Sequence, residues 1–97
     1  MSGFYPVETE IGGLGSKPLM SPTVFRERGF RFFFFSREEP RMHIHVISAD
    51  GEAKFWLEPA IEMAQNWGLA QKDLALVREL IEERSDEIRA AWRQHFG

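Results

Sequence analysis

Residues 43–58 have the sequence HIHVISADGEAKFWLE, and this stretch decides the fold because it holds two candidate strands and the turn that joins them. Residues 42–48 are rich in β-branched side chains, which favour strands. Asp50 and Gly51 tolerate positive φ, as the two central residues of a type I′ hairpin turn require. The stretch therefore predicts an antiparallel hairpin in which residues 52–58 form the returning strand.

A two-residue turn determines which residues of the two strands face each other. It places His45 opposite Trp56 and His43 opposite Glu58. Opposite side chains share a face, and the faces alternate along a strand. One face is typical of a core and consists of Ile44, Val46, Ser48, Ala53, Phe55 and Leu57. The other face mixes imidazole, indole and charged groups and consists of His43, His45, Ile47, Lys54, Trp56 and Glu58. A face that is neither cleanly polar nor cleanly apolar is a candidate contact or reaction surface.

The segments around the hairpin predict four further elements. Residues 23–25 and 30–35 are expected to form strands, and residues 59–66 and 71–95 are expected to form a short and a long helix. Proline at the first position and glycine just past the end are typical of a helix such as the short one. Arg84 interrupts the apolar stripe of the long helix, so a bend is expected just after it. Because the strands precede the helices, the expected fold is α+β: an antiparallel meander of three or four strands with both helices packed on one face.

Composition narrows the class of protein. The chain has 97 residues, a net charge of −3 and no cysteine, which excludes a disulfide scaffold, a cysteine nucleophile and a cysteine-ligated metal site. Residues 1–19 are rich in glycine and are expected to form a flexible leader, whereas residues 20–97 are expected to form a single compact α+β domain. The sequence has neither an apolar run of membrane-spanning length nor the pattern of a signal peptide. We therefore expect a cytoplasmic protein with no membrane partner and no cofactor.

The His-x-His pattern of His43 and His45 places two imidazoles on the same side of a strand, about 6.5–7 Å apart by backbone rise. A zinc ion would need further ligands; Glu58 is the best-placed carboxylate and no other ligand stands at a telling spacing, so no metal site is expected. Two histidines beside Lys54 also form the set of groups that cleaves RNA, namely a base, an acid and a cation for the phosphate. In a third interpretation the histidines are polar positions on a half-exposed strand, with His45 stacked on Trp56.

Positive charge gathers in the strand region of this acidic chain. An anionic ligand or an acidic partner would be steered to such a region by its electrostatic potential. The candidate catalytic residues are therefore His43 and His45, and the candidate binding residues are Arg31, Arg41, Lys54, Trp56 and Glu58.

Five stretches of the sequence resemble a known family. They are residues 21–24 (SPTV), 29–36 (GFRFFFFS), 43–46 (HIHV), 53–57 (AKFWL) and 92–96 (WRQHF). Together they resemble the small bacterial domain-of-unknown-function family 4160, and the resemblance extends over about residues 20–97. Genes of this family often lie beside a second small gene, an arrangement similar to that of type II toxin–antitoxin pairs, which implies a small protein partner. A serine often stands at the position of Ala70, so the long helix is expected to lack its usual N-cap. The resemblance points to His43 and His45 without assigning them roles.

Two functional hypotheses follow from the residues and the resemblance. In the first, the protein is the small bacterial component of a toxin–antitoxin-like pair and acts by binding a small protein partner encoded by the neighbouring gene. In the second, it is a metal-independent ribonuclease that uses the sheet face with His43 and His45. The sequence leaves open whether the protein is an enzyme, whether it is toxin or antitoxin, and whether RNA or a second copy of the chain is a further partner.

Overall fold

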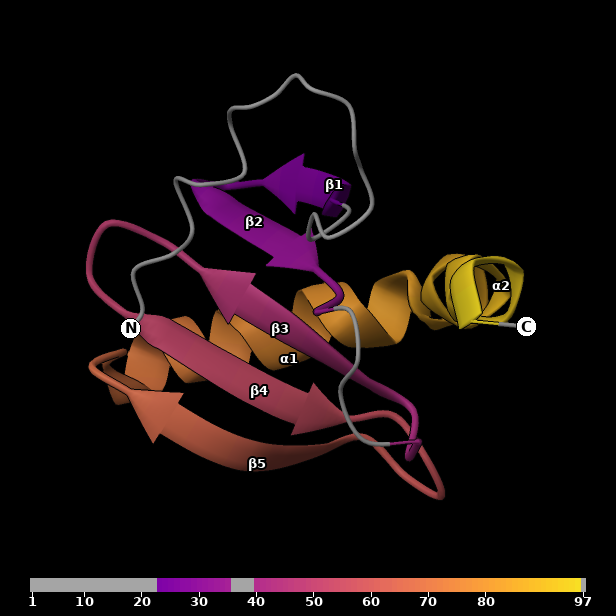
Figure 1. Cartoon of the computed structure of the whole chain (residues 1–97). Helices are drawn as coiled ribbons and strands as arrows, with labels where there is room; N and C mark the ends of the chain where they lie inside the picture. Colours follow the sequence, from indigo (N-terminus) through magenta and orange to yellow (C-terminus); the bar gives the residue numbers. More distant parts are fainter. Residues whose placement is uncertain (1–22, 36–39, 97) are drawn as a thin grey trace.

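The computed structural model describes residues 23–35 and 40–96, which form one antiparallel sheet and two helices. The strands follow one another in chain order across the sheet, as Figure 1 shows. The elements are β1 (Thr23–Glu27), β2 (Phe30–Phe33), β3 (His43–Ile47), β4 (Glu52–Trp56), β5 (Glu62–Trp67), α1 (Gln71–Glu83) and α2 (Ser85–Phe96). The predicted α+β class and antiparallel meander are confirmed, although the sheet has five strands where the sequence predicts three or four. The predicted leader, residues 1–19, lies outside the described residues.

β3 and β4 form the predicted hairpin, but their pairing differs from the prediction by two residues. Ile44 lies opposite Phe55 and Val46 lies opposite Ala53. The loop between the strands therefore covers residues 48–51 instead of two residues. Because side chains alternate with a period of two, a shift by two residues leaves every side chain on its predicted face. The two predicted faces of the hairpin are thus correct even though the predicted partners across it are wrong.

Gly51 in this loop packs directly against the end of β5. A Cβ atom added to Gly51 would overlap the carbonyl oxygen of Trp67, so only glycine fits at this point of the backbone. Neither Asp50 nor Gly51 has positive φ, which a type I′ turn would require. The loop is closed instead by the amide of Ser48, which donates a hydrogen bond to the carbonyl oxygen of Gly51 at 2.9 Å. The glycine is therefore needed for close approach of two backbones and not for a tight turn.

A tight two-residue turn lies between β1 and β2. Glu27 pairs with Phe30, and the two residues between them, Arg28 and Gly29, have φ values of 56° and 84°. Positive φ at both central positions is the signature of a type I′ turn, whose twist matches that of the strands it joins. Arg28 is unusual there, since a side chain with a Cβ atom is strained at positive φ and asparagine or glycine is preferred.

β5 is the main departure from the predicted fold, because the sequence predicts a short helix over residues 59–66. Within this segment Gln65 pairs with Lys54, and Asn66 pairs with Ala53. Methionine, alanine and glutamine have good helix propensity, but propensity is a weak preference that tertiary contacts override. Pairing with β5 satisfies the backbone N–H and C=O groups along the outer edge of β4, which a helix at this position could not do.

Gly68 ends β5 instead of capping a helix, and its φ of 99° redirects the chain towards α1. The side chain of Asn66 accepts a hydrogen bond from the amide of Leu69 and donates one to its carbonyl oxygen, each at 3.0 Å. Ala70 is the N-cap residue of α1 and makes no side-chain capping hydrogen bond, as the sequence predicts. The turn into α1 is therefore held by the asparagine and not by a helix cap.

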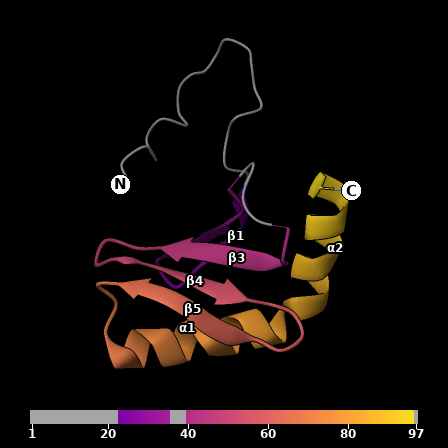
Figure 2. The ribbon, with the colours of Figure 1, turned by 60° about the horizontal axis from the view of Figure 1, so that its bottom comes forward.

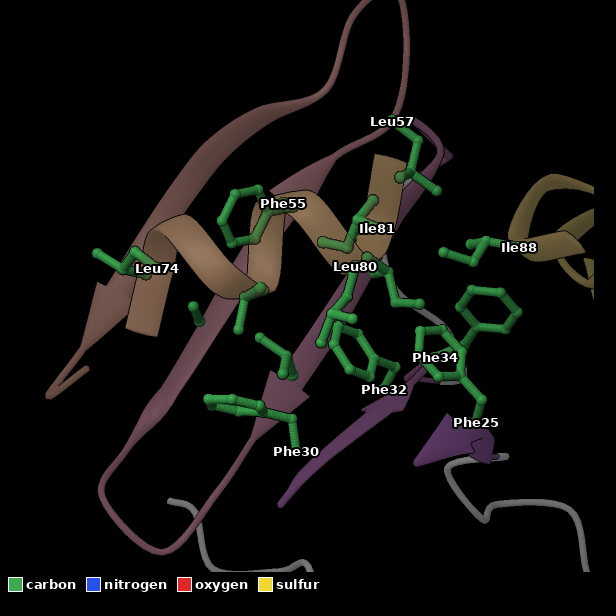
Figure 3. Packing of buried hydrophobic residues seen from close by; sticks show 14 of the residues in the cluster. Phe25, Phe30, Phe32, Phe34, Phe55, Leu57, Leu74, Leu80, Ile81 and Ile88 are labelled. Carbon is green, nitrogen blue, oxygen red and sulfur yellow. The ribbon is translucent and has the colours of Figure 1, made fainter. Parts of the chain in front are cut away.

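The core lies between α1 and one face of the sheet. α1 runs along this face (Figure 2), and its buried side chains are Leu74, Val77, Leu80 and Ile81. They pack against the apolar side chains of the sheet in one cluster, which Figure 3 shows from close by. The sheet supplies to this cluster Phe25, Phe30, Phe32, Ile44, Val46, Ala53 and Phe55, with Leu57 just beyond β4. Removal of this much apolar surface from water is the main stabilising contribution that the fold provides.

α2 leaves the core face and lies at the end of the sheet, which Figure 2 shows most clearly. The helices are separated at Arg84, where the sequence predicts a bend. The Arg84 guanidinium pairs with the Glu27 carboxylate at 2.9 Å and lies 4.2 Å from the ring centroid of Phe25. The predicted long helix is therefore two helices: α1 packs on one face of the sheet as expected, whereas α2 lies at the end of the sheet, where its Trp92 contacts Phe34 at the margin of the same core cluster. The predicted short helix, which was also expected on this face, is the strand β5. Within the described residues, no helix is both long and apolar enough to span a membrane.

Candidate functional site

The sheet face opposite α1 carries the histidines. Strand alternation places His43 and His45 on this face of β3, and the strand register brings β2 and β4 side chains beside them. His45 lies opposite Phe33 on one side and Lys54 on the other, and His43 lies opposite Trp56. We call these five side chains the histidine face. The sequence predicts the same hairpin residues on this face but pairs His45 with Trp56, which the register shows to be wrong.

Both imidazoles of the histidine face are buried. His43 is 0% exposed and His45 is 3% exposed, which contradicts the interpretation that they lie on a half-exposed strand. The His45 ring stacks on Phe33 with centroids 5.5 Å apart, and its centroid lies 4.6 Å from that of Phe35. It does not stack on tryptophan as expected. Aromatic side chains from the neighbouring strand and loop therefore cover a face that was expected to be exposed to solvent.

Trp92 of α2 covers His43 from the end of the sheet. The centroid of the His43 ring lies 5.1 Å from that of Trp92, 5.8 Å from that of Trp56 and 5.2 Å from that of His45. Trp92 is not among the candidate site residues that the sequence predicts. No local signal could assign it to His43, because the two residues are far apart in the sequence and meet only through the path of α2.

A hydrogen bond to the backbone determines which tautomer the neutral His43 ring adopts. Nδ1 of His43 lies 2.6 Å from the carbonyl oxygen of Arg41. A carbonyl oxygen only accepts hydrogen bonds, so Nδ1 carries the proton and donates. In the neutral ring the lone pair then belongs to Nε2. The Arg41 backbone thus determines which nitrogen of His43 can accept a proton or a hydrogen bond.

His45 is neutral at physiological pH. The pKa of its imidazole is lowered to about 3, first by burial and then by electrostatic interaction with His43 and Lys54, which acts in the same direction. An imidazole with such a low pKa carries almost no proton near neutral pH, so it cannot serve as a general acid there.

Two cations flank the indole of Trp56 at the edge of the histidine face. The guanidinium carbon of Arg41 lies 4.1 Å from a Trp56 ring centroid, and Nζ of Lys54 lies 4.6 Å from a Trp56 ring centroid. Both distances are within the range of cation–π attraction. Arg41 is held in place because its Nε donates a hydrogen bond to the carbonyl oxygen of Glu58 at 2.9 Å. We call Arg41, Lys54 and Trp56 the Trp56 surface.

Residues 29–93 match the family described as "Domain of unknown function (DUF4160)". This protein belongs to the DUF4160 family. The family that the sequence resembles is thereby confirmed. No curated protein and no solved structure matches the chain. The DUF4160 match includes the whole histidine face and the Trp56 surface, whereas β1 precedes it.

Of the two remaining predicted binding residues of this DUF4160 protein, Glu58 lies apart from the histidines and Arg31 lies on their sheet face beside Phe33. Glu58 Oε2 accepts a hydrogen bond from Arg89 Nε of α2 at 3.0 Å, so its carboxylate forms an ion pair at the end of the sheet. It does not lie opposite His43 as the sequence predicts. Arg31 lies on the same sheet face as the histidines, where its guanidinium carbon is 4.6 Å from the Phe33 ring centroid and its Nε donates to Thr23 Oγ1 at 2.6 Å.

The structure thus unites Arg41, Lys54 and Trp56 with both histidines, and it separates the Glu58 carboxylate from them. In residues 23–35 and 40–96 there is no group of three or more histidine, aspartate and glutamate side chains that could hold a metal ion. The DUF4160 domain therefore holds two buried imidazoles beside an indole that contacts two cations.

Proposed function

We propose that this protein is an interaction module, the small cytoplasmic component of a bacterial toxin–antitoxin-like pair, and that its Trp56 surface binds a small acidic protein partner. The partner is the product of the neighbouring gene. The exposed Arg41 supplies the charge that attracts the partner, and Trp56 supplies apolar contact area. Lys54, which is 8% exposed, holds its ammonium group against the indole from within the sheet face.

The observation that carries the proposal is the placement of two cations beside a half-buried indole. Tryptophan and arginine are the residues that most often dominate the energetics of protein–protein interfaces. The chain as a whole is acidic, with a net charge of −3, so a basic patch on it is a local feature. An acidic partner would be steered towards this patch and away from the rest of the surface.

A ribonuclease is the alternative function. In this alternative the two histidines act as acid and base, and the cations Arg41 and Lys54 hold a phosphate. Two properties of the histidines count against it. Both rings are buried, and the pKa of His45, which burial lowers to about 3, leaves that residue unable to donate a proton at neutral pH. The interaction module is therefore the better supported function.

The test is co-expression of the full chain with the product of the adjacent gene, followed by measurement of the dissociation constant of the complex. We expect Trp56→Ala to weaken binding by roughly 30-fold or more, as is typical of a tryptophan at the centre of an interface, and Arg41→Ala to weaken it less. Trp67→Ala is the matched control, because Trp67 is also a tryptophan of the sheet and its side chain is 50% exposed. This variant is expected to leave binding unchanged.

Absence of a complex with the wild-type chain would overturn the proposal, and so would equal losses for Trp56→Ala and Trp67→Ala. Thermal melting of each variant establishes that the variants are folded. The ribonuclease alternative is tested with a labelled RNA and the purified chain. RNA cleavage that His43→Ala abolishes would replace the interaction module with the enzyme.

A further inference from the structure

A second candidate site lies at the other end of β3 from the Trp56 surface. It is a pocket of about 330 Å³ where the β1–β2 turn meets the start of the β3–β4 loop. The residues that line it are Arg26, Gly29, Phe30, Arg31, Ile47 and Ser48. Ile47 is four residues along β3 from His43, which corresponds to roughly 13 Å of strand. The pocket, which we call the arginine pocket, is therefore separate from the surface proposed to bind the protein partner.

Two arginines face each other beside this pocket. Arg26 of β1 lies directly opposite Arg31 of β2 in the strand register. Like charges in directly opposite positions of a sheet destabilise it. Among the described residues Arg26 forms no ion pair and no side-chain hydrogen bond, whereas Arg84 and Arg89 are each paired with a carboxylate. The two arginines therefore concentrate positive charge at the pocket. In the described part of the chain, Arg26 makes no ion pair or side-chain hydrogen bond that would explain its presence by the stability of the fold.

The turn next to the pocket adds a third arginine at a strained position. Arg28 has a φ of 56°, in the left-handed region that favours glycine or asparagine. Backbone strain of this kind tends to persist at sites where the residue serves a function. Its neighbour Gly29 also lines the pocket and has no atom within 4 Å of where a Cβ would lie, so the wall of the pocket is open there.

The wall of the pocket beside the arginines is apolar. Ile47, which lies opposite Arg31 in the strand register, contributes a branched aliphatic side chain, whereas the Phe30 ring packs in the core on the other face of the sheet. A fully polar anion such as inorganic phosphate would gain nothing from this wall and would lose hydration against it. A ligand with an apolar body and one carboxylate can instead place the body against Ile47 and the carboxylate near the guanidinium groups.

We propose that the arginine pocket binds an amphipathic carboxylate, that is, an apolar group of about five carbon atoms or an apolar side chain joined to one carboxylate. Two sources have this chemistry: a free carboxylic acid, and an acidic residue next to an apolar residue in a polypeptide. The proposal does not depend on the Trp56 surface or on the partner that it binds.

The experiment is a titration of the full chain, labelled with ¹⁵N, with hexanoate, followed by amide chemical shifts. We expect the amides of Gly29, Ile47 and Ser48 to shift. Hexanamide has the same apolar body without the charge, and it is expected to bind at least tenfold more weakly. Inorganic phosphate is expected to cause no saturable shifts of these amides. Acetyl-Leu-Asp-amide represents the polypeptide source, and comparison of its affinity with that of hexanoate distinguishes the two sources.

Two variants test the role of the arginines. Arg26→Gln keeps most of the side-chain length and removes the charge, and we expect it to weaken hexanoate binding at least fivefold. Arg93→Gln is the matched control, because Arg93 is an exposed arginine of α2 with no part in the pocket, and it is expected to change nothing. Equal binding of hexanamide, saturable binding of phosphate at these amides, or an unchanged affinity in Arg26→Gln would overturn the proposal. Binding of neither hexanoate nor the peptide would overturn it as well.

The outcome is independent of the partner experiment. If the partner binds through Trp56 while hexanoate does not bind, the pocket proposal fails and the proposed function stands. If hexanoate binds while no partner complex forms, the reverse conclusion follows.

Discussion

The two faces of the sheet are buried to a similar extent by different chemistry. On the face toward α1, Ile44 and Phe55 are buried among apolar side chains. On the histidine face, His43 and His45 are equally buried, but their neighbours are aromatic rings and the ammonium group of Lys54. Burial of an apolar side chain stabilises the fold by removing surface from water, whereas burial of an imidazole resists its protonation. The difference indicates that the face toward α1 stabilises the fold, whereas stability alone does not require the buried imidazoles of the histidine face.

The largest expected effect tests the core face. Phe55→Ala removes a side chain that is 1% exposed and leaves a cavity under α1, so the free energy of unfolding should fall by about 3–5 kcal/mol. The control is Met63→Ala, which alters the β5 residue paired with Phe55 at 46% exposure and should cost less than about 1 kcal/mol. Denaturant unfolding of both variants checks this. Similar losses would mean that β5 is packed against the core more closely than its exposure indicates.

The histidine face should make stability depend on pH. The folded chain lowers the pKa of His45 from 6.5 to about 3, so between these pH values the unfolded chain binds the proton more readily. The free energy of unfolding should therefore fall as the pH drops below 6.5, with a loss of about 3 kcal/mol by pH 4, at up to about 1.4 kcal/mol per pH unit. No such contribution from His45 is expected above pH 6.5.

The control for the pH effect is His45→Gln, which removes the titrating group. Its unfolding free energy should fall less steeply over this range, and the difference between the two pH profiles gives the contribution of His45. Direct titration of the His45 imidazole by NMR provides a second measurement. A pKa near 6.5 in the folded chain would show that the imidazole is accessible to water and that the two faces do not differ as described.

The register that keeps the two faces apart should be sensitive to Gly51. Gly51→Ala places a Cβ atom against the Trp67 carbonyl, so the loop or β5 must shift, at a cost of about 1–3 kcal/mol. Asp50→Ala changes the neighbouring exposed residue and should cost less than about 0.5 kcal/mol. Chemical denaturation measures both values, and faster amide exchange in β4 and β5 of Gly51→Ala would locate the disturbance. A Gly51→Ala variant as stable as the wild type would contradict the close approach of the two backbones.

The smallest effect concerns the turn that aligns β1 with β2. Arg28→Asn should stabilise the chain by about 0.5–1 kcal/mol, because asparagine tolerates the positive φ at this position better than arginine does. Arg28→Ala is the control, since it removes the charge but keeps a Cβ atom at the same φ, and it should give no gain. Thermal unfolding checks both variants. Equal gains would show that repulsion among the arginines, and not backbone strain, limits the stability of this turn.

Much of the sheet could be predicted because its signal is local. Residues 43–58 alternate between apolar and polar side chains, and this pattern assigned Ile44, Phe55 and both histidines to their correct faces although the predicted pairing was shifted. The predicted faces are correct despite the wrong pairing, because a shift of the strand register by an even number of residues leaves each side chain on the same face.

β5 could not be predicted because its residues have no strand pattern of their own. Glu62 to Trp67 became a strand by pairing with β4, a contact that local propensity does not contain. The candidate site was predictable only in part for the same reason. The sequence brought His43, His45, Lys54 and Trp56 to one face, but only the path of α2 and of the aromatic β2 strand could bury the histidines.

By itself, the sequence determined the α+β class, the alternation of the β3–β4 hairpin and the apolar stripe of α1, since each follows from the spacing of residues within one segment. Only the tertiary structure decided the five-stranded sheet, the place of α2 at its end, the ion pair that takes Glu58 away from His43, and the low pKa of His45. These features depend on which distant segments meet. Burial and charge at a residue are properties of its neighbours in space, and a chain pattern specifies them only where those neighbours are also close in sequence.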